Sequence, residues 1–179
     1  MASASGANAA TETYDFLGSH AGTYYTSKDF SSDQGNSVNV TTGTYGTYIS
    51  DGSTGGGWVG QWTGYGLGSC TYAGAGYCAE RHYVDGRGKN EFLRFSFGHD
   101  VTIQSIAFKD YGDNFFDLLL ADGTNLIDLS YNAAGLFSST IDALGSVFSI
   151  GAWNSGSGFK VQSITVSYDT PSQVPLPRA

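Results

Sequence analysis

The sequence predicts an all-β protein folded as a single antiparallel β-sandwich of jelly-roll type. Its 179 residues include 26 glycines, 12 tyrosines and 11 phenylalanines, whereas lysine and arginine together number 8 and methionine occurs once. Aromatic residues favour strands, and the residues that favour exposed helix surfaces are scarce. Apolar and polar residues alternate in several short segments separated by glycine-rich turns, which is typical of half-buried strands.

The first third of the chain contains three strand candidates. Residues 1–12 are small and polar, and we expect them to be flexible. Strands are predicted at Thr13–Phe16, at Ser37–Thr42, where valines alternate with polar residues, and at Trp58–Trp62. The segment 41–57 is rich in glycine, serine and threonine, and is predicted to be a loop.

The clearest strand pattern follows in the middle of the chain. Phe92–Phe97 alternates apolar with polar side chains, and Val101–Ile103 repeats the alternation. Gly98–Asp100 between them resembles a tight turn, so the two segments are predicted to form a hairpin. The apolar positions shift by one residue after the second segment, which predicts a β-bulge near Gln104–Ser105.

The last third continues the β pattern. Phe115–Ala121 is a mostly apolar run, and Leu126–Leu129 is the expected second arm of its hairpin. Ala133–Leu144 is the one place where a helical turn is expected. Val147–Ile150 and Val161–Tyr168 complete a set of roughly eight to ten short strands, which is typical of a sandwich or jelly roll.

Length and charge limit the domain organisation and the partners. Residues 13–169 are predicted to be one domain, because a domain usually has roughly 100–200 residues. Residues 170–179 contain all three prolines and are predicted to be an extended linker. The net charge of −8 argues against nucleic acid and anionic membrane surfaces, which bind clustered lysine and arginine. No apolar run approaches the roughly 18 residues that span a bilayer.

The tail carries a short motif. Val174, Pro175, Leu176 and Pro177 follow one another in a sequence that resembles the start of the VPLPA variant of the PEP-CTERM sorting signal. In that family a transmembrane helix and a basic cluster follow the motif, and an exosortase processes the tail. Arg178 stands where the variant has alanine. The resemblance implies contact with a membrane only through a further C-terminal segment.

The body of the chain is similar to the same group over about residues 58–168. The shared features are Gly66-Leu67-Gly68, the close cysteine pair, Asp85-Gly86 ahead of Asn90-Glu91, Phe95-Ser96-Phe97, Val101-Thr102-Ile103 and the closing run from Trp153 to Ser167. Tail and body together imply an exported protein of the cell surface or extracellular matrix of a Gram-negative bacterium that makes extracellular polysaccharide. Because roles in the group are mostly unassigned, the resemblance implies a location more than an activity.

The two cysteines, Cys70 and Cys78, enclose seven residues. In an exported protein two cysteines most simply form a disulfide. Closing a loop this short stabilises a fold by roughly 2–3 kcal/mol. Free thiols and a metal site are the alternatives, although the spacing matches no zinc pattern.

A group of oxygen-bearing side chains precedes the clearest strand. Asp85, Asn90 and Glu91 lie in a glycine-containing loop there, and Asp113 belongs to a second acidic loop at 110–114. Calcium takes about six to eight oxygen ligands from such loops, so these four residues are the predicted metal ligands. The two loops are expected at the same end of the sandwich because two strands intervene. The alternative is that these are turn residues with solvated side chains.

Trp58, Trp62 and Tyr65 belong to a region rich in glycine and aromatic residues, and they are the predicted ligand-binding residues. Exposed aromatic faces stack on sugar rings, and a matrix protein meets extracellular polysaccharide. The alternative is that these side chains pack in the core or under loops, as large aromatics in β proteins usually do.

No catalytic residues are predicted. The histidines, His20, His82 and His99, lie in no recognisable catalytic motif. The acidic residues that could supply a carboxylate pair for glycan hydrolysis are Glu91, Asp110, Asp113 and Asp117.

These observations lead us to expect a non-catalytic structural or adhesive matrix protein, sorted by its C-terminal signal, with calcium as a candidate stabilising ion. A carbohydrate-binding module that recognises exopolysaccharide is the alternative from a different class, and a glycan hydrolase is a distant third. Exposed sheet edges would also allow self-association.

Overall fold

The computed structural model describes residues 9–18, 23–45, 53–54, 57–71, 83–86, 90–110, 115–120, 131–132, 136–138, 144–152 and 158–169. Within these ranges the regular secondary structure is all β and the strand pairs are antiparallel, which confirms the predicted all-β, sandwich-like fold. The strands are β1 (Ala9–Asp15), β2 (Thr23–Tyr25), β3 (Ser27–Ser31), β4 (Ser37–Tyr45), β5 (Ser53–Thr54), β6 (Trp58–Trp62), β7 (Gly66–Cys70), β8 (Val84–Asp85), β9 (Asn90–Asp110), β10 (Phe115–Leu120), β11 (Tyr131–Asn132), β12 (Leu136–Ser138), β13 (Leu144–Ala152) and β14 (Gly158–Asp169).

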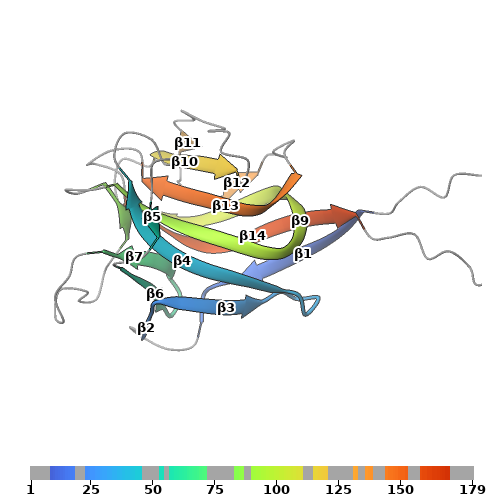
Figure 1. Ribbon diagram of the computed structural model, residues 1–179, viewed down its shortest axis with the longest axis horizontal. Coiled ribbons are helices and arrows are strands. Elements are labelled where there is room, and N and C mark those ends of the chain that lie inside the picture. The colour runs from blue at the N-terminus through green and yellow to red at the C-terminus, as the bar shows by residue number, and fades with distance from the viewer. Residues whose placement is uncertain are drawn as a thin grey trace, which may run out of the picture.

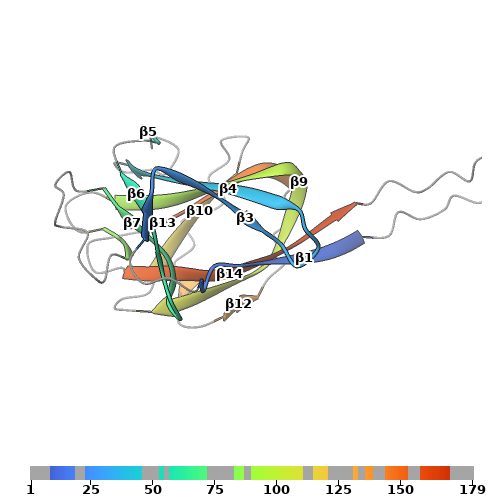
Figure 2. The same ribbon diagram turned by 90° about the horizontal axis from the view of Figure 1, so that it is seen from below.

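The strands form two layers that share the long strand β9 (Figure 1, Figure 2). In one layer, β4 and β13 lie on either side of the first half of β9, with β3 and β5 beyond β4, and β10 and β11 beyond β13. In the other layer, β14 pairs with the second half of β9, and β1, β7 and β8 lie along the opposite edge of β14. The hairpin of β6 and β7, followed by β2, extends this second layer.

The predicted hairpin around Gly98–Asp100 is wrong. Residues 90–110 form one continuous strand, β9, which bends at this point and passes from one layer to the other (Figure 2). Asn90–Phe97 pairs with β4, whereas the part that begins at Thr102 pairs with β14. The tripeptide that resembles a turn is therefore the corner between the two layers.

The bulge predicted near Gln104 is confirmed. Thr165 lies opposite Ser105 and Val166 opposite Ile103, so Gln104 is the extra residue on β9. Because side chains alternate between the faces of a strand, one extra residue reverses which positions face the core. The apolar residues on both sides of the bulge are consequently all buried, namely Val101, Ile103, Ile106 and Phe108.

Several other predicted strands agree with the structure, with shifted boundaries. Trp58–Trp62 is β6 as predicted, and Ser37–Thr42 lies within β4, which continues to Tyr45. Because β5 also lies at Ser53–Thr54, the segment 41–57 is not a loop throughout. Phe115–Ala121 and Val161–Tyr168 correspond to β10 and β14.

Two predictions at the edges of the pattern fail. The first strand begins at Ala9, inside the segment predicted to be flexible, and Glu12 within it is buried. The helical turn expected in Ala133–Leu144 is wrong where that segment is described, because 136–138 and Leu144 lie in strands. Leu126–Leu129 lies outside the described residues.

The core fills the space between the two layers. Aromatic rings pack edge to face across it, with centroids 5.0 Å apart for Phe16 and Phe30 and 6.0 Å apart for Phe97 and Phe148. Completely burying one such side chain stabilises the fold by about 1.5–3 kcal/mol. Among the described residues, no helix is long and apolar enough to cross a membrane.

Candidate functional site

Two carboxyl side chains, Glu12 and Glu91, and one amino side chain, Lys160, are buried in the described part of the chain. A buried charge is unfavourable unless other groups solvate it. These three residues are therefore the starting points for identifying a functional site inside the fold. Sequence reasoning singled out only Glu91.

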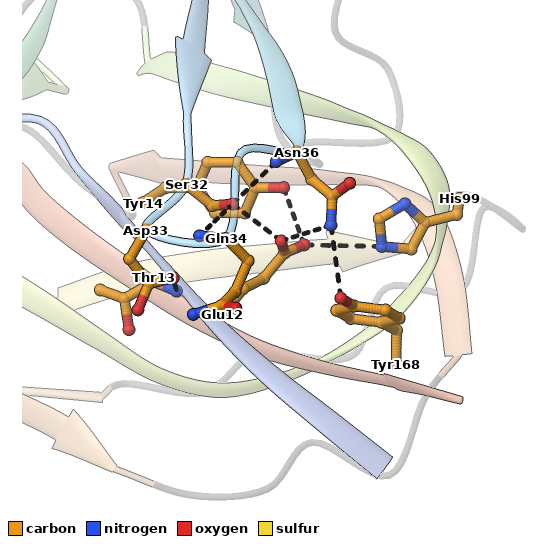
Figure 3. Close-up of polar contacts among 9 residues, drawn as sticks. All are labelled: Glu12, Thr13, Tyr14, Ser32, Asp33, Gln34, Asn36, His99 and Tyr168. Carbon is orange, nitrogen blue, oxygen red and sulfur yellow. Dashed lines mark hydrogen bonds and ion pairs between the residues drawn. The ribbon is translucent and has the colours of Figure 1, made fainter. Parts of the chain in front are cut away.

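The carboxylate of Glu12 lies at the centre of a hydrogen-bonded cluster (Figure 3). Its Oε1 accepts a hydrogen bond from the Tyr14 hydroxyl at 2.8 Å. Its Oε2 accepts hydrogen bonds from the Ser32 hydroxyl at 2.9 Å and from Asn36 Nδ2 at 2.8 Å. Burial, together with the hydrogen bond to Glu12, raises the pKa of Tyr14, so the phenol stays protonated and donates.

Two further side chains complete this group from the far side (Figure 3). His99 Nε2 lies 3.5 Å from Glu12 Oε1, too long for a strong hydrogen bond but close enough for an ion pair when the imidazole is protonated. The His99 ring packs edge-on against Tyr168, with centroids 4.6 Å apart. Asn36 Nδ2 also approaches the Tyr168 hydroxyl at 3.4 Å. We call Glu12, Tyr14, Ser32, Asn36, His99 and Tyr168 the Glu12 cluster.

The Glu12 cluster joins parts of the chain that are far apart in sequence. Glu12 comes from β1, Ser32 and Asn36 from the connection between β3 and β4, His99 from the corner of β9, and Tyr168 from the end of β14. A second contact strengthens the same junction, because the Thr13 amide donates to Asp33 Oδ1 at 2.8 Å. The cluster therefore fixes the first strand to both layers.

The predicted metal ligands come together in part. Glu91 Oε1 accepts hydrogen bonds from the Thr71 amide at 3.0 Å and from the Thr71 hydroxyl, and Glu91 Oε2 accepts from the Asp85 amide at 3.3 Å. Burial, with a smaller contribution from the charge of Asp85, raises the pKa of Glu91 to about 7. Asn90 precedes Glu91 and pairs with Tyr45 of β4.

Of the second acidic loop, 110–114, the structure describes only Asp110, and the two strands expected between the two acidic loops are the single strand β9. Phe159 lies opposite Asp110 on one side and opposite Val84 on the other, so the end of β9 and β8 flank the same end of β14. Asp113 itself lies outside the described residues. Among the residues that are described, no group of three or more His, Cys, Asp or Glu side chains could hold a metal ion.

Cys70 ends β7 and is fully buried. The described part of the chain contains no free cysteine. Cys78 lies outside the described residues, as do His20, His82 and the tail motif. The Cys70–Cys78 pairing thus stays a prediction.

The three predicted ligand-binding aromatics all belong to the β6–β7 hairpin. Trp58 and Trp62 are four residues apart on β6, so their side chains lie on the same face of the strand. Tyr65 lies in the turn between β6 and β7. Tyr65 is 47% exposed, whereas Trp62 is 6% exposed. The Trp62 ring folds back over Gly60, where an added Cβ would lie 2.1 Å from a ring carbon, and it packs edge-on against Tyr24.

Lys160 of β14 lies among the rings of this hairpin. Its Nζ is 3.4 Å from the centroid of Trp62, 5.4 Å from that of Tyr83 and 5.7 Å from that of Tyr65. The residue is 2% exposed, and this burial lowers the pKa of Lys160 to about 7. We call Trp62, Tyr65, Tyr83 and Lys160 the aromatic box.

A glycine places the hairpin against β14. Gly66 has a φ of 98°, and an added Cβ would lie 2.3 Å from the carbonyl oxygen of Val161. Only glycine fits this combination of a left-handed backbone and close backbone contact. The resulting pairing of Leu67 with Val161 puts Trp62 next to the neighbouring Lys160.

Sequence reasoning missed both the Glu12 cluster and Lys160. The sequence offered one signal for Lys160. The residue alternates with Phe159 and Val161, which are buried in the core, so its side chain lies on the opposite face of the strand. The aromatic hairpin that covers this face is visible only in the structure. Glu12 gave a weaker signal, a single carboxylate alternating with Tyr14 near the start of the chain.

No protein-family model matches the chain, and no curated protein or solved structure is significantly similar to it. The likeness to PEP-CTERM proteins therefore stays a prediction. The function of the protein is inferred from its own residues and their geometry.

Proposed function

We propose that the protein is a non-catalytic extracellular module that serves as a structural or adhesive component of a polysaccharide matrix. The proposal rests on the hydrogen bonds of the two buried carboxylates. Glu12 and Glu91 each accept hydrogen bonds on both oxygens from groups of the same chain. These hydrogen bonds link strands and loops of the same chain, which supports a stabilising role for both carboxylates.

A catalytic carboxylate must reach the proton or carbon on which it acts. Glu12 is 0% exposed, and the Ser32 hydroxyl beside it donates to Glu12 while it accepts the backbone amides of Gln34 and Asn36. The hydroxyl is therefore engaged in a turn. These contacts support a stabilising role for the cluster over a hydrolytic one.

Incubation with extracellular polysaccharide from the native host tests this proposal. We expect the protein to sediment with the insoluble polysaccharide and to release no reducing ends. Release of reducing ends by the wild-type protein but not by Glu91→Gln would contradict the proposal and favour a glycan hydrolase.

Sorting through the tail is the second part of the proposal. Val174, Pro175, Leu176 and Pro177 supply the motif, and an exosortase would process it. The experiment is fractionation of native host cells that express the natural gene with and without Pro175→Ala and Pro177→Ala. We expect the double variant to lose processing and surface retention, and an unchanged distribution would remove the sorting signal.

Calcium and the disulfide are proposed as stabilisers of one end of the sandwich. Asp85 and Glu91 meet there, and Asn90 and Asp113 are the further proposed ligands. Chelation with EDTA should lower the melting temperature, and calcium should restore it. An unchanged midpoint would remove the ion. Thiol alkylation without reductant should leave Cys70 and Cys78 unlabelled, and labelling of either residue would remove the disulfide.

Carbohydrate binding is the second candidate function, and the aromatic hairpin favours it. Trp58 and Trp62 share a face, and Tyr65 beside them is half exposed. Binding of oligosaccharides from the host polysaccharide should fall in Tyr65→Ala. The matched control is Leu144→Ala, because Leu144 is the other large apolar side chain that is exposed in the described part of the chain. Equal binding by both variants would argue against the hairpin as the site.

A further inference from the structure

The aromatic box contains two hydrogen-bond donors on adjacent side chains. Trp62 Nε1 is buried without a hydrogen-bond partner among the described residues. Within the same part of the chain, the contacts of Lys160 Nζ are with the faces of Trp62, Tyr65 and Tyr83. Buried polar groups in proteins nearly always have partners, so an unpartnered indole N–H beside an ammonium group requires an explanation.

Aromatic faces alone do not supply what these donors lack. A ring face attracts an ammonium group through its quadrupole, which offsets part of the lost hydration. It offers no lone pair to the ammonium hydrogens, and the indole N–H points along the edge of its own ring. The missing partner is therefore an acceptor, and a negatively charged acceptor would also neutralise Lys160.

A carboxylate fits these requirements, since its two oxygens can accept from both donors and charge-assisted bonds of this kind are the strong ones. The exposed side of the aromatic box, formed by Tyr65, indicates which kind of molecule would bear the carboxylate. Tyr65 is 47% exposed and is the ring farthest from Lys160 Nζ, at 5.7 Å. A sugar ring could stack on this face while its carboxylate reaches inward.

We propose that the aromatic box binds the carboxylate of an acidic sugar residue, with Lys160 and Trp62 Nε1 as donors and Tyr65 as the stacking surface. The inference rests on the carbohydrate-binding candidate above and names its ligand class. The ligand enters past Tyr65, whose turn is formed by Gly64 and Gly66, both with positive φ. Burial lowers the pKa of Lys160 to about 7, and a bound carboxylate would raise it again.

Calorimetric titration with oligogalacturonate and with its methyl ester tests the proposal, because esterification removes the charge and keeps the sugar rings. The wild-type protein should prefer the free acid. Lys160→Met should weaken binding of the acid by about ten-fold or more, the usual effect of losing a charge-assisted hydrogen bond. The matched control is Arg94→Met, because Arg94 is a cation on the half of β9 that pairs with β4 in the other layer, and this variant should bind both ligands as the wild type does. Lys109 is unsuitable as a control because it lies directly opposite Lys160.

Other outcomes would overturn the inference. Equal binding of acid and ester would remove the carboxylate site and leave the carbohydrate function standing, whereas no binding of either would remove both. Competition by polyglutamate as strong as that by oligogalacturonate would assign the box to acidic peptides. An NMR titration of the Lys160 side chain in the wild-type protein gives a readout that depends on no variant. The acid should raise the pKa of Lys160, and an unchanged pKa would overturn the proposal.

Discussion

The Glu12 cluster and the aromatic box differ in how they accommodate a buried charge. Glu12 accepts hydrogen bonds from Tyr14, Ser32 and Asn36, and His99 lies near the same carboxylate. Lys160 contacts ring faces and has no acceptor among the described residues. Glu12 lies on β1, which pairs with β14, whereas Lys160 lies on β14 itself, and both residues are almost fully buried.

This difference separates a stabilising site from a candidate binding site. A carboxylate with all its partners in place rigidifies the strands that supply them. A buried ammonium without an acceptor lowers the stability of the free protein. Binding of a ligand that supplies an acceptor would remove this unfavourable contribution.

Glu12→Ala should have the largest effect on stability. It removes the common acceptor of three buried or half-buried donors and leaves them unpaired. We expect the free energy of unfolding to fall by about 3–5 kcal/mol, as when one partner of a buried polar pair is removed. Urea denaturation measures it. Asp29→Ala, which removes an exposed carboxylate hydrogen-bonded to Asn39, is the control and should change stability by less than about 1 kcal/mol. Equal effects would contradict the assignment of the Glu12 cluster.

Gly66→Ala tests how the aromatic box is placed. Besides the strain of a positive φ, the added Cβ would meet the Val161 carbonyl oxygen, so we expect a loss of about 2–4 kcal/mol. Gly64→Ala is the matched control, because Gly64 has a φ of 73° but open space around the added Cβ. It should lose only about 1–2 kcal/mol. If both variants lose the same amount in thermal denaturation, backbone contact with β14 does not hold the hairpin.

The dependence of stability on pH should separate Glu91 from Lys160. The pKa of Glu91 rises on folding from 4.5 to about 7, so its contribution is full below pH 4.5 and is lost as the pH rises through 7. The pKa of Lys160 falls on folding from 10.5 to about 7, so its contribution is full above pH 10.5 and is lost as the pH falls through 7. Their combined contribution should therefore be smallest near pH 7.

Urea denaturation between pH 4.5 and 10.5 measures this profile. Glu91→Gln should flatten the acidic side alone, and Lys160→Met the alkaline side alone. A single variant that flattens both sides would show that the two groups are coupled, contrary to their separate surroundings.

Lys160→Met should have the smallest effect at neutral pH, and its sign is informative. Replacing a buried ammonium that has no acceptor by an apolar side chain of similar length should leave stability unchanged or raise it by up to about 2 kcal/mol. Calorimetric melting of the free protein measures the change. A loss greater than 2 kcal/mol would mean that Lys160 stabilises the free fold, as Glu12 does, and would remove the contrast between the sites.

Local patterns predicted much of the fold. The alternation around Val38 and Val40 located β4, and the slip in apolar positions located the bulge at Gln104, because both follow from the two-residue period of a strand. The corner of β9 was misjudged because Gly98 and Asp100 are also common turn residues. Whether such a segment turns back or continues depends on partner strands elsewhere in the chain.

The candidate sites were predicted only where their residues are close in sequence. Asp85 and Glu91, six residues apart, were predicted to share a site, and the backbone amide of Asp85 donates a hydrogen bond to Glu91 Oε2. The donors to Glu12 include Asn36, which is 24 residues away. The sequence around Glu12 contains no pattern that predicts this contact. No site was predicted at Lys160, because the aromatic rings that cover it belong largely to a hairpin almost a hundred residues earlier in the chain.

Because β9 contributes its first half to one layer and its second half to the other, we expect unravelling of one layer to disrupt the strand on which the other layer depends. Loss of structure should thus be an all-or-none event, with coincident transitions by fluorescence and circular dichroism. The same strand pairs mainly with segments distant in sequence, so refolding should be slow, on the order of milliseconds to seconds. In the matrix role proposed above, such a strand would transmit a pulling force from one layer directly to the other.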